Sequence, residues 1–252
     1  MIQSFIKFSP NNSLILLATA LCIGSFSALS AQVAHLADVN ASRKAFKPSF
    51  ESGDGTLVIK EGSLSYNVED PTEKDFQYLL FQPARLRASQ DFTITGTFKN
   101  DAIPESSKEL ASIGIEVYQA TDLRNRMAAT LSVARLKGFF SRTVFAQVVE
   151  GSEPVDSTYS SDLRVPIETT FKLSFDSGKK VFSVFYVRDG SEATEWESVG
   201  SFGINGNGGA DGNARWRMKN TEKLLVYVYG YSENMQIFDN DVEVTALSIE
   251  ID

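Results

Sequence analysis

The sequence predicts an all-β protein, built as a two-sheet antiparallel jelly-roll sandwich. From about residue 50 the chain runs through about twelve short segments in which apolar and polar residues alternate, and these segments are rich in Val, Phe, Thr and Tyr. After residue 31 no stretch has a convincing helical period, and no spacing indicates strand–helix–strand units. The 252-residue length also suits a larger sandwich than an immunoglobulin module.

Residues 1–31 have the pattern of a secretory signal peptide. Lys7 is the only charged residue before position 31, and an apolar run from Leu14 to Gly24 is followed by small residues around Ser30 and Ala31. The run is short for a membrane span and precedes a cleavage pattern. We therefore expect a mature chain with no transmembrane segment, which is secreted, periplasmic or at the cell surface.

Residues 32–48 carry no clear period, so we expect a linker or loosely docked arm, followed by one domain at 49–252. The turn at 175–180, with the sequence FDSGKK, predicts a hairpin. No repeat of 20–50 residues indicates a propeller or solenoid. The predicted strands lie at 55–62, 63–68, 76–81, 91–98, 111–118, 128–135, 143–150, 169–176, 180–190, 196–202, 223–231 and 242–252.

Four of these stretches suggest a family. The sequences at 62–76, 91–98, 196–216 and 228–234 resemble secreted bacterial concanavalin A-like (laminin-G-like) jelly-roll domains, and the resemblance covers nearly the whole mature chain. It implies a curved sandwich of the lectin or glucanase type, often carbohydrate-binding and sometimes calcium-binding or structural. The matching motifs are structural rather than catalytic, so the resemblance bears on fold more than on activity.

Several chemistries are excluded by composition. The only cysteine, Cys22, lies in the signal, and the only histidine, His35, lies in the arm. A serine or cysteine triad would have no base in the domain, and a histidine-rich zinc site would have no ligands. The net charge is −8 and no dense basic run is present, so we expect no nucleic-acid partner.

A glycoside hydrolase would need two carboxyl groups on facing sides of a sugar. The Glu–Asp–Glu signature of the laminarinase-like enzymes is absent. The nearest matches are Glu195 with Glu197, and Asp239 with Asp241 and Glu243, which polar strand faces explain equally well. The related jelly-roll lyases use a histidine or glutamine with tyrosine and arginine. We therefore predict no catalytic residue.

Tyr227, Tyr229 and Tyr231 are the first ligand-binding candidates. They alternate with Val226 and Val228, so the tyrosines share one face of a strand and the valines the other. The valine face suits the inter-sheet core, which places the tyrosines on the outer face. Flat rings with polar tips can stack on sugars, but cross-strand aromatic pairing would also explain the row.

Trp216, flanked by Arg215 and Arg217, is a second ligand-binding candidate, with simple packing as the alternative. The preceding glycine-rich stretch, 203–213, predicts a loop. The side chains of Asn205, Asn207 and Asp211 could give oxygen ligands to calcium, although a plain surface loop needs none.

The segment 124–142 is locally basic. Five cations stand beside one acid, Asp122, and this excess could attract an anionic glycan, unless it is only a solvated hairpin tip. The cations are Arg124, Arg126, Arg135, Lys137 and Arg142.

Together these features indicate an exported, non-catalytic sandwich that binds carbohydrate or a cell-envelope component. Two alternatives stay open. One is a glycoside hydrolase or polysaccharide lyase of the same fold, and the other is a structural or adhesive module that binds protein.

Overall fold

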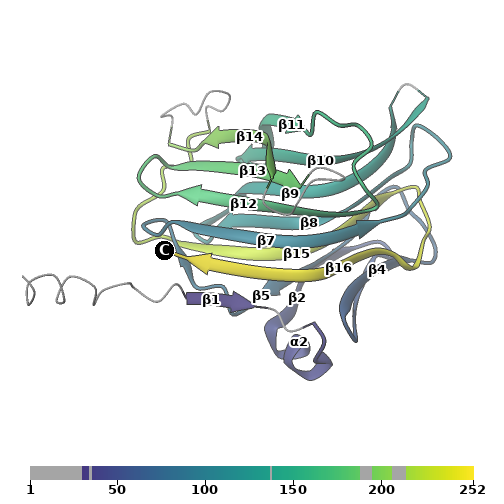
Figure 1. Ribbon diagram of the computed structural model, residues 1–252, viewed down its shortest axis with the longest axis horizontal. Helices are drawn as coiled ribbons and strands as arrows, with labels where there is room; N and C mark the ends of the chain where they lie inside the picture. The colour runs from purple at the N-terminus through teal and green to yellow at the C-terminus, as the bar shows by residue number, and fades with distance from the viewer. Residues whose placement is uncertain (1–29, 34–35, 137, 188–194, 206–213) are drawn as a thin grey trace, which may run out of the picture.

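The computed structural model describes residues 30–33, 36–136, 138–187, 195–205 and 214–252 (Figure 1). The expected signal peptide therefore lies outside the described residues, except for Ser30 and Ala31. His35 and Lys137 also lie outside them. Over the described ranges, no helix has the length and apolar character that a membrane crossing requires.

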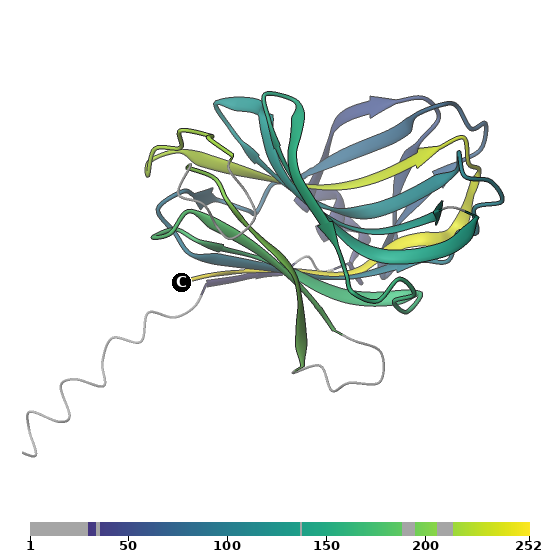
Figure 2. The ribbon, with the colours of Figure 1, turned by 90° about the horizontal axis from the view of Figure 1, so that it is seen from above.

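The predicted two-sheet antiparallel sandwich is confirmed. In the described part of the chain sixteen strands form two eight-stranded sheets, which Figure 2 shows as two layers. Sheet A has the order β14 (Trp196–Gly203), β13 (Val181–Val187), β12 (Glu168–Asp176), β7 (Phe92–Asn100), β16 (Ile237–Ile251), β4 (Ser63–Val68), β3 (Thr56–Lys60), with β1 (Ser30–Val33) beside β16. Sheet B has the order β11 (Glu153–Tyr159), β10 (Phe139–Glu150), β9 (Asp122–Leu136), β8 (Leu110–Gln119), β15 (Lys223–Glu233), β5 (Asp75–Phe81), β2 (Phe46–Ser52), with β6 (Leu86–Arg87) beside β15.

Each of the twelve predicted segments forms a strand. The four further strands, β1, β2, β6 and β11, lacked the signal that alternation gives. β6 has two residues, and β2 and β11 lie at sheet edges with mostly exposed side chains. Such strands bury too little apolar surface to impose a period of two on the sequence.

The core lies between the sheets and follows from the alternation. In β7 every second side chain is buried, and the rings of Phe98 and Phe171 stack with centroids 4.2 Å apart. The facing strand β8 contributes Ile113 and Ile115 to the same core. Asn100 joins the two sheets, because its buried side-chain amide donates to the carbonyl oxygens of Ala111 and Leu131, both at 3.1 Å.

The segment expected as an arm, 32–48, supplies ordered elements to the sandwich. Helix α2 (Val39–Ala45) is capped by Asp38, whose carboxylate accepts from the Asn40 and Ala41 amides at 2.9 and 3.1 Å. Leu36 and Phe46 on either side of the helix are buried in the core, and β2 pairs with β5. The arm is thus attached by two apolar anchors and a strand pairing.

Candidate functional site

The tyrosine row lies on the outer face of sheet B, as the alternation predicts. Val226 and Val228 belong to the inter-sheet core, whereas Tyr227 and Tyr229 do not. The tyrosines are nevertheless only 3% and 8% exposed. The outer face is therefore covered here, and the covering groups are other aromatic side chains.

An aromatic cluster surrounds the row. Tyr227 packs edge-on against Tyr118 at 5.0 Å and contacts Phe50 of β2 at 5.6 Å, measured between ring centroids. Tyr78 of β5 stacks on Tyr229 at 5.0 Å with the planes 8° apart. Tyr227 is thus interior to the cluster and packs as cross-strand pairing predicts, whereas Tyr229 stands at its border.

Next to this border the outer face is hollowed into a cavity of about 560 Å³, which we call the sheet B groove. Its lining combines rings with small polar groups. The rings are Tyr78, Tyr229, Tyr231, Phe145 and Tyr159. The small polar groups are Ser112, Thr130, Ser132, Ser141, Thr143 and Gln147. Tyr229 and Tyr231 of the three predicted tyrosines therefore line a cavity.

Strand pairing explains how the rings form two walls. Tyr229 lies opposite Tyr78 on one side and opposite Gly114 on the other. Gly114 lies opposite Thr130, Thr130 opposite Phe145, and Phe145 opposite Tyr159. Across the sheet, two aromatic rings are followed by a glycine and a threonine and then by two more aromatic rings. The two small residues lie in the middle, where the surface is lowest.

The floor of the groove depends on the missing side chain of Gly114. A Cβ there would stand 2.7 Å from the Thr130 Cα and would press on the Ala129 carbonyl oxygen. Beside it, the hydroxyls of Ser112 and Ser132 are 2.8 Å apart, and those of Thr130 and Ser132 are 2.9 Å apart. The floor therefore presents linked hydroxyls that can each donate and accept.

One ion pair borders the floor. The Nε of Arg126 lies 3.4 Å from the Oε2 of Glu116, and the Glu116 side chain is 4% exposed. Burial raises the pKa of Glu116, while the Arg126 charge and a contact with Tyr118 oppose that shift. Burial, followed by the Glu116 charge, also raises the pKa of Tyr78 and of Tyr229. These two phenols therefore stay neutral near pH 7.

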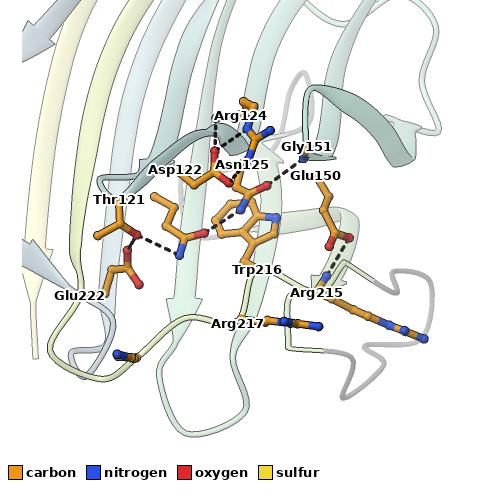
Figure 3. Close-up of a pocket in the computed structure, with 12 residues that line it drawn as sticks. Thr121, Asp122, Arg124, Asn125, Glu150, Gly151, Arg215, Trp216, Arg217 and Glu222 are labelled. Atoms are coloured by element: carbon orange, nitrogen blue, oxygen red, sulfur yellow. Dashed lines mark hydrogen bonds and ion pairs between the residues drawn. The ribbon is translucent and has the colours of Figure 1, made fainter.

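Trp216, Arg215 and Arg217 line a different cavity, also of about 560 Å³, which we call the end pocket (Figure 3). Trp216 is 2% exposed, its indole Nε1 donates to the Val149 carbonyl at 3.1 Å, and its ring lies 5.7 Å from that of Phe182. Trp216 is thus a core residue at the pocket base. The predicted ligand residues do not form one site.

The end pocket is polar, and its groups are largely satisfied by one another. Asn125 donates to the side-chain oxygen of Gln119 and accepts from the Gly151 amide, both at 2.8 Å, as Figure 3 shows for Asn125 and Gly151. The carboxylate of Glu150 accepts from the backbone amide of Arg215 at 2.9 Å. The Glu150 bond holds the loop before β15 on the sandwich end, and the two Asn125 bonds hold the turn after β10 against β8 and β9.

The calcium ligands expected in the glycine-rich loop are described at one position only. The side-chain oxygen of Asn205 accepts from the Met218 amide at 3.2 Å, and Asn207 and Asp211 lie outside the described residues. Where side chains are described, no three Asp, Glu, His or Cys residues gather as a metal site. Asn205 thus has a structural partner of its own.

The basic segment is dispersed rather than patch-forming. Arg124 pairs with Asp122 at 2.8 Å, and the Nε atoms of Arg135 and Arg142 donate to backbone carbonyls, each at 2.7 Å. Of the described cations in the segment, Arg126 is the one that lines the sheet B groove.

The paired carboxylates considered from the sequence lie on strands of sheet A, except for Glu195, which directly precedes β14. Asp239 pairs with Lys60 at 3.2 Å, and Glu243 accepts from the Ser63 hydroxyl at 2.8 Å. Glu197 accepts a hydrogen bond from Ser161. Among the described residues that line the sheet B groove, Glu116 is the one carboxylate.

Sequence reasoning missed Glu116, Gly114 and Tyr78, and it named Arg126 only as one of five cations in the basic segment. A signal for Glu116 exists in the stretch IGIEVY at 113–118, where it is the one charged residue. The outward position of Glu116 follows from the alternation. The position of its partner on β9 does not follow, because the register between two strands cannot be deduced from the sequence of either strand alone.

Neither a family model nor a curated protein sequence matches the chain. Solved structures do. The exoplasmic/lumenal domain of VIP36 with Ca²⁺ and Man2 bound is similar, with a TM-score of 0.53, 11% identity and 88% of each chain covered. The chain has a concanavalin A-like fold.

Two other lectin-type structures support the same assignment. The potassium-bound carbohydrate recognition domain of Emp46p has a TM-score of 0.51 at 10% identity, covering 87% of this chain and 95% of that one. Peanut lectin with a nine-residue peptide has a TM-score of 0.53 at 9% identity, covering 90% and 98%. Identities this low show the fold, and function has to be argued from the site.

Proposed function

We propose that the protein is a non-catalytic carbohydrate-binding sandwich and that the sheet B groove holds the glycan. One observation carries the proposal: a floor of linked hydroxyls around Gly114 lies between the Tyr78–Tyr229 wall and the Phe145–Tyr159 wall. A sugar offers apolar C–H faces and hydroxyl edges. Rings suit the first and small donors and acceptors suit the second.

The size of the groove fits an oligosaccharide. On β9 the lining runs along the strand from Arg126 to Ala134, eight residue steps or roughly 26 Å at about 3.3 Å each. That length accommodates several sugar rings in a row. The lectin-type neighbours support a glycan ligand, because the VIP36 domain was solved with Man2 bound and the Emp46p structure is of its carbohydrate recognition domain.

The groove lacks the groups that hydrolysis requires. Both retaining and inverting glycosidases use two carboxyl groups, and Glu116 is the single carboxylate among the described lining residues. Tyr78 and Tyr229, with their raised pKa values, are poor general bases. These features favour binding without turnover.

Export to the periplasm, the cell surface or the medium is part of the proposal. It rests on the signal pattern at 1–31, and amino-terminal sequencing of protein from the producing cell would test it. Calcium also stays a proposal at Asn205, Asn207 and Asp211. The test is whether glycan binding changes when EDTA is added.

The first experiment is a glycan array, run with calcium and again with EDTA, followed by calorimetric titration of any selected glycan. Tyr159→Ala removes a ring that is 56% exposed in the groove wall, and Phe238→Ala removes one that is 61% exposed on sheet A. We expect Tyr159→Ala to weaken binding roughly tenfold, equal to about 1.4 kcal/mol, and Phe238→Ala to leave it unchanged. Equal losses, or a folded protein that binds no glycan, would overturn the proposal.

A further inference from the structure

The sheet B groove carries one cation and one anion among its described lining residues, Arg126 and Glu116. Their exposures differ. The Arg126 side chain is 28% exposed, whereas the Glu116 side chain is 4% exposed. A ligand in the groove therefore meets far more of the Arg126 side chain than of the Glu116 carboxylate.

The pair is incomplete. The Nε of Arg126 and the Oε2 of Glu116 are 3.4 Å apart, and within the described structure neither atom has a hydrogen-bond partner. A well-formed arginine–carboxylate pair makes two parallel bonds at about 2.7–2.9 Å. Both atoms are buried, and buried polar atoms left without a bond cost free energy, so Glu116 holds Arg126 less firmly than a well-formed pair would. The exposed part of the Arg126 side chain is the part that a ligand in the groove can meet.

The remaining lining contributes no opposing charge. It consists of hydroxyls, phenols, one amide and apolar groups. A carboxylate on a sugar ring would meet a guanidinium at the groove border and neutral donors elsewhere. The sugar carboxylate and Glu116 would then both lie beside Arg126. Two carboxylates so near to each other do not both stay ionised, because the like charges repel. The buried carboxylate is the one that loses its charge at lower cost.

Resting on the glycan groove proposed above, we propose that its ligands are acidic glycans, whose uronate carboxylate binds the exposed side of Arg126 while Glu116 takes up one proton from the solvent. The charge balance is closed by that proton: before binding, the pair is neutral, and afterwards Arg126 and the uronate form the neutral pair beside a protonated Glu116. The affinity for a uronate therefore rises as pH falls, while the affinity for an uncharged analogue does not.

The groups that face Glu116 come from four strands. Tyr118 is on its own strand, Arg126 on β9, Tyr227 and Tyr229 on β15, and Tyr78 on β5. The set contains no histidine. Burial raises the pKa of Glu116, which brings its protonation toward neutral pH and agrees with the proposed proton uptake.

The test is calorimetric titration with tetrasaccharides of mannuronate, guluronate, galacturonate and glucuronate, each beside its fully methyl-esterified form. The carboxylate of a uronate has a pKa of about 3.5, so it stays ionised at pH values above about 5.5. We expect at least one acid form to bind tenfold or more tightly than its ester. We also expect its affinity to rise up to tenfold per pH unit as the pH falls from about 8 to 6. Titrations in buffers of different ionisation enthalpy should show that the protein takes up one proton on binding.

Three variants separate the two residues. Glu116→Gln should hold the acid affinity at its low-pH level and abolish proton uptake. Arg126→Gln should remove the preference for acid over ester while ester binding persists. Arg126→Lys keeps the charge without the fork and should give an intermediate preference, which covers the case in which Arg126→Gln does not fold.

The outcomes are distinguishable. Equal binding of acid and ester forms would overturn the inference and leave the glycan groove standing. Acid binding without pH dependence would overturn the role of Glu116. If no glycan of either kind binds the folded protein, both the inference and the proposed function fail.

Discussion

Tyr78 and Tyr229 stack nearly parallel across the β5–β15 pair, with ring centroids 5.0 Å apart and planes 8° apart. The stack joins the aromatic cluster to the sheet B groove, because Tyr227 and Tyr118 support it from one side and the groove opens on the other. A wall made in this way is held in place before any ligand arrives. Preorganisation of that kind lowers the entropic cost of binding.

The stack predicts different outcomes for two changes at Tyr229. Tyr229→Ala removes a ring that is 8% exposed and should cost about 3–5 kcal/mol of the free energy of unfolding, by analogy with other buried aromatic truncations. Tyr229→Phe keeps the ring and should cost far less. Urea denaturation would measure both. Equal costs would mean that the hydroxyl, rather than the stacked ring, holds the wall.

The floor predicts that Gly114→Ala is destabilising. The added Cβ would press on the Ala129 carbonyl oxygen and on Thr130, which should cost about 1–3 kcal/mol and reduce glycan binding. Gly178→Ala is the matched control, since its Cβ would meet only the Asp176 side chain at 3.4 Å. Thermal unfolding and calorimetry of both variants would check this. Unchanged stability and glycan affinity in Gly114→Ala would show that the floor can shift to accept the extra methyl group.

Glu116 predicts the pH dependence of stability. Burial raises the pKa of Glu116 in the folded protein above 4.5, the ordinary value for a glutamate. At a pH between the unfolded-state pKa and the folded-state pKa, the folded state therefore binds more protons than the unfolded state. Its presence therefore lowers stability as pH rises through that window, by at most about 1.4 kcal/mol per pH unit, and has no effect below it. Glu116→Gln should gain relative stability as pH rises in urea titrations. A parallel pair of pH curves would contradict the raised pKa.

The end pocket predicts that Trp216 is structural and Arg215 is not. Trp216→Ala should cost about 3–5 kcal/mol, because the ring is buried against Phe182 and its Nε1 holds the Val149 carbonyl. Arg215→Ala, at an exposed position beside it, should change stability by less than about 0.5 kcal/mol. Chemical denaturation would rank the two, and a reversed ranking would sink this assignment of roles.

The sequence predicts much of this architecture because alternation is local. The two faces of β15 were readable from Val226, Tyr227 and Val228 alone, and so was the sandwich they imply. The stacking of Tyr78 on Tyr229 was not, because it depends on β5 lying next to β15, strands that are distant in the chain. The Glu116–Arg126 pair needed the β8–β9 register for the same reason. Trp216 looked like a ligand residue because its flanking arginines are exposed, although its own side chain points into the core.

The order of strands in the two sheets sets when this protein can fold. β15 lies between β8 and β5 in sheet B, and β16 lies between β7 and β4 in sheet A, so residues 223–251 supply an inner strand to each layer. Until that segment has been synthesised, each layer is divided into two groups of paired strands, β1 and β6 have no partner strand, and the core between the layers stays open to water. Pairings so distant in the chain make folding slow. We therefore expect the native state to form only after residues 223–251 are available, and removal of the last two strands to abolish it rather than to shorten it.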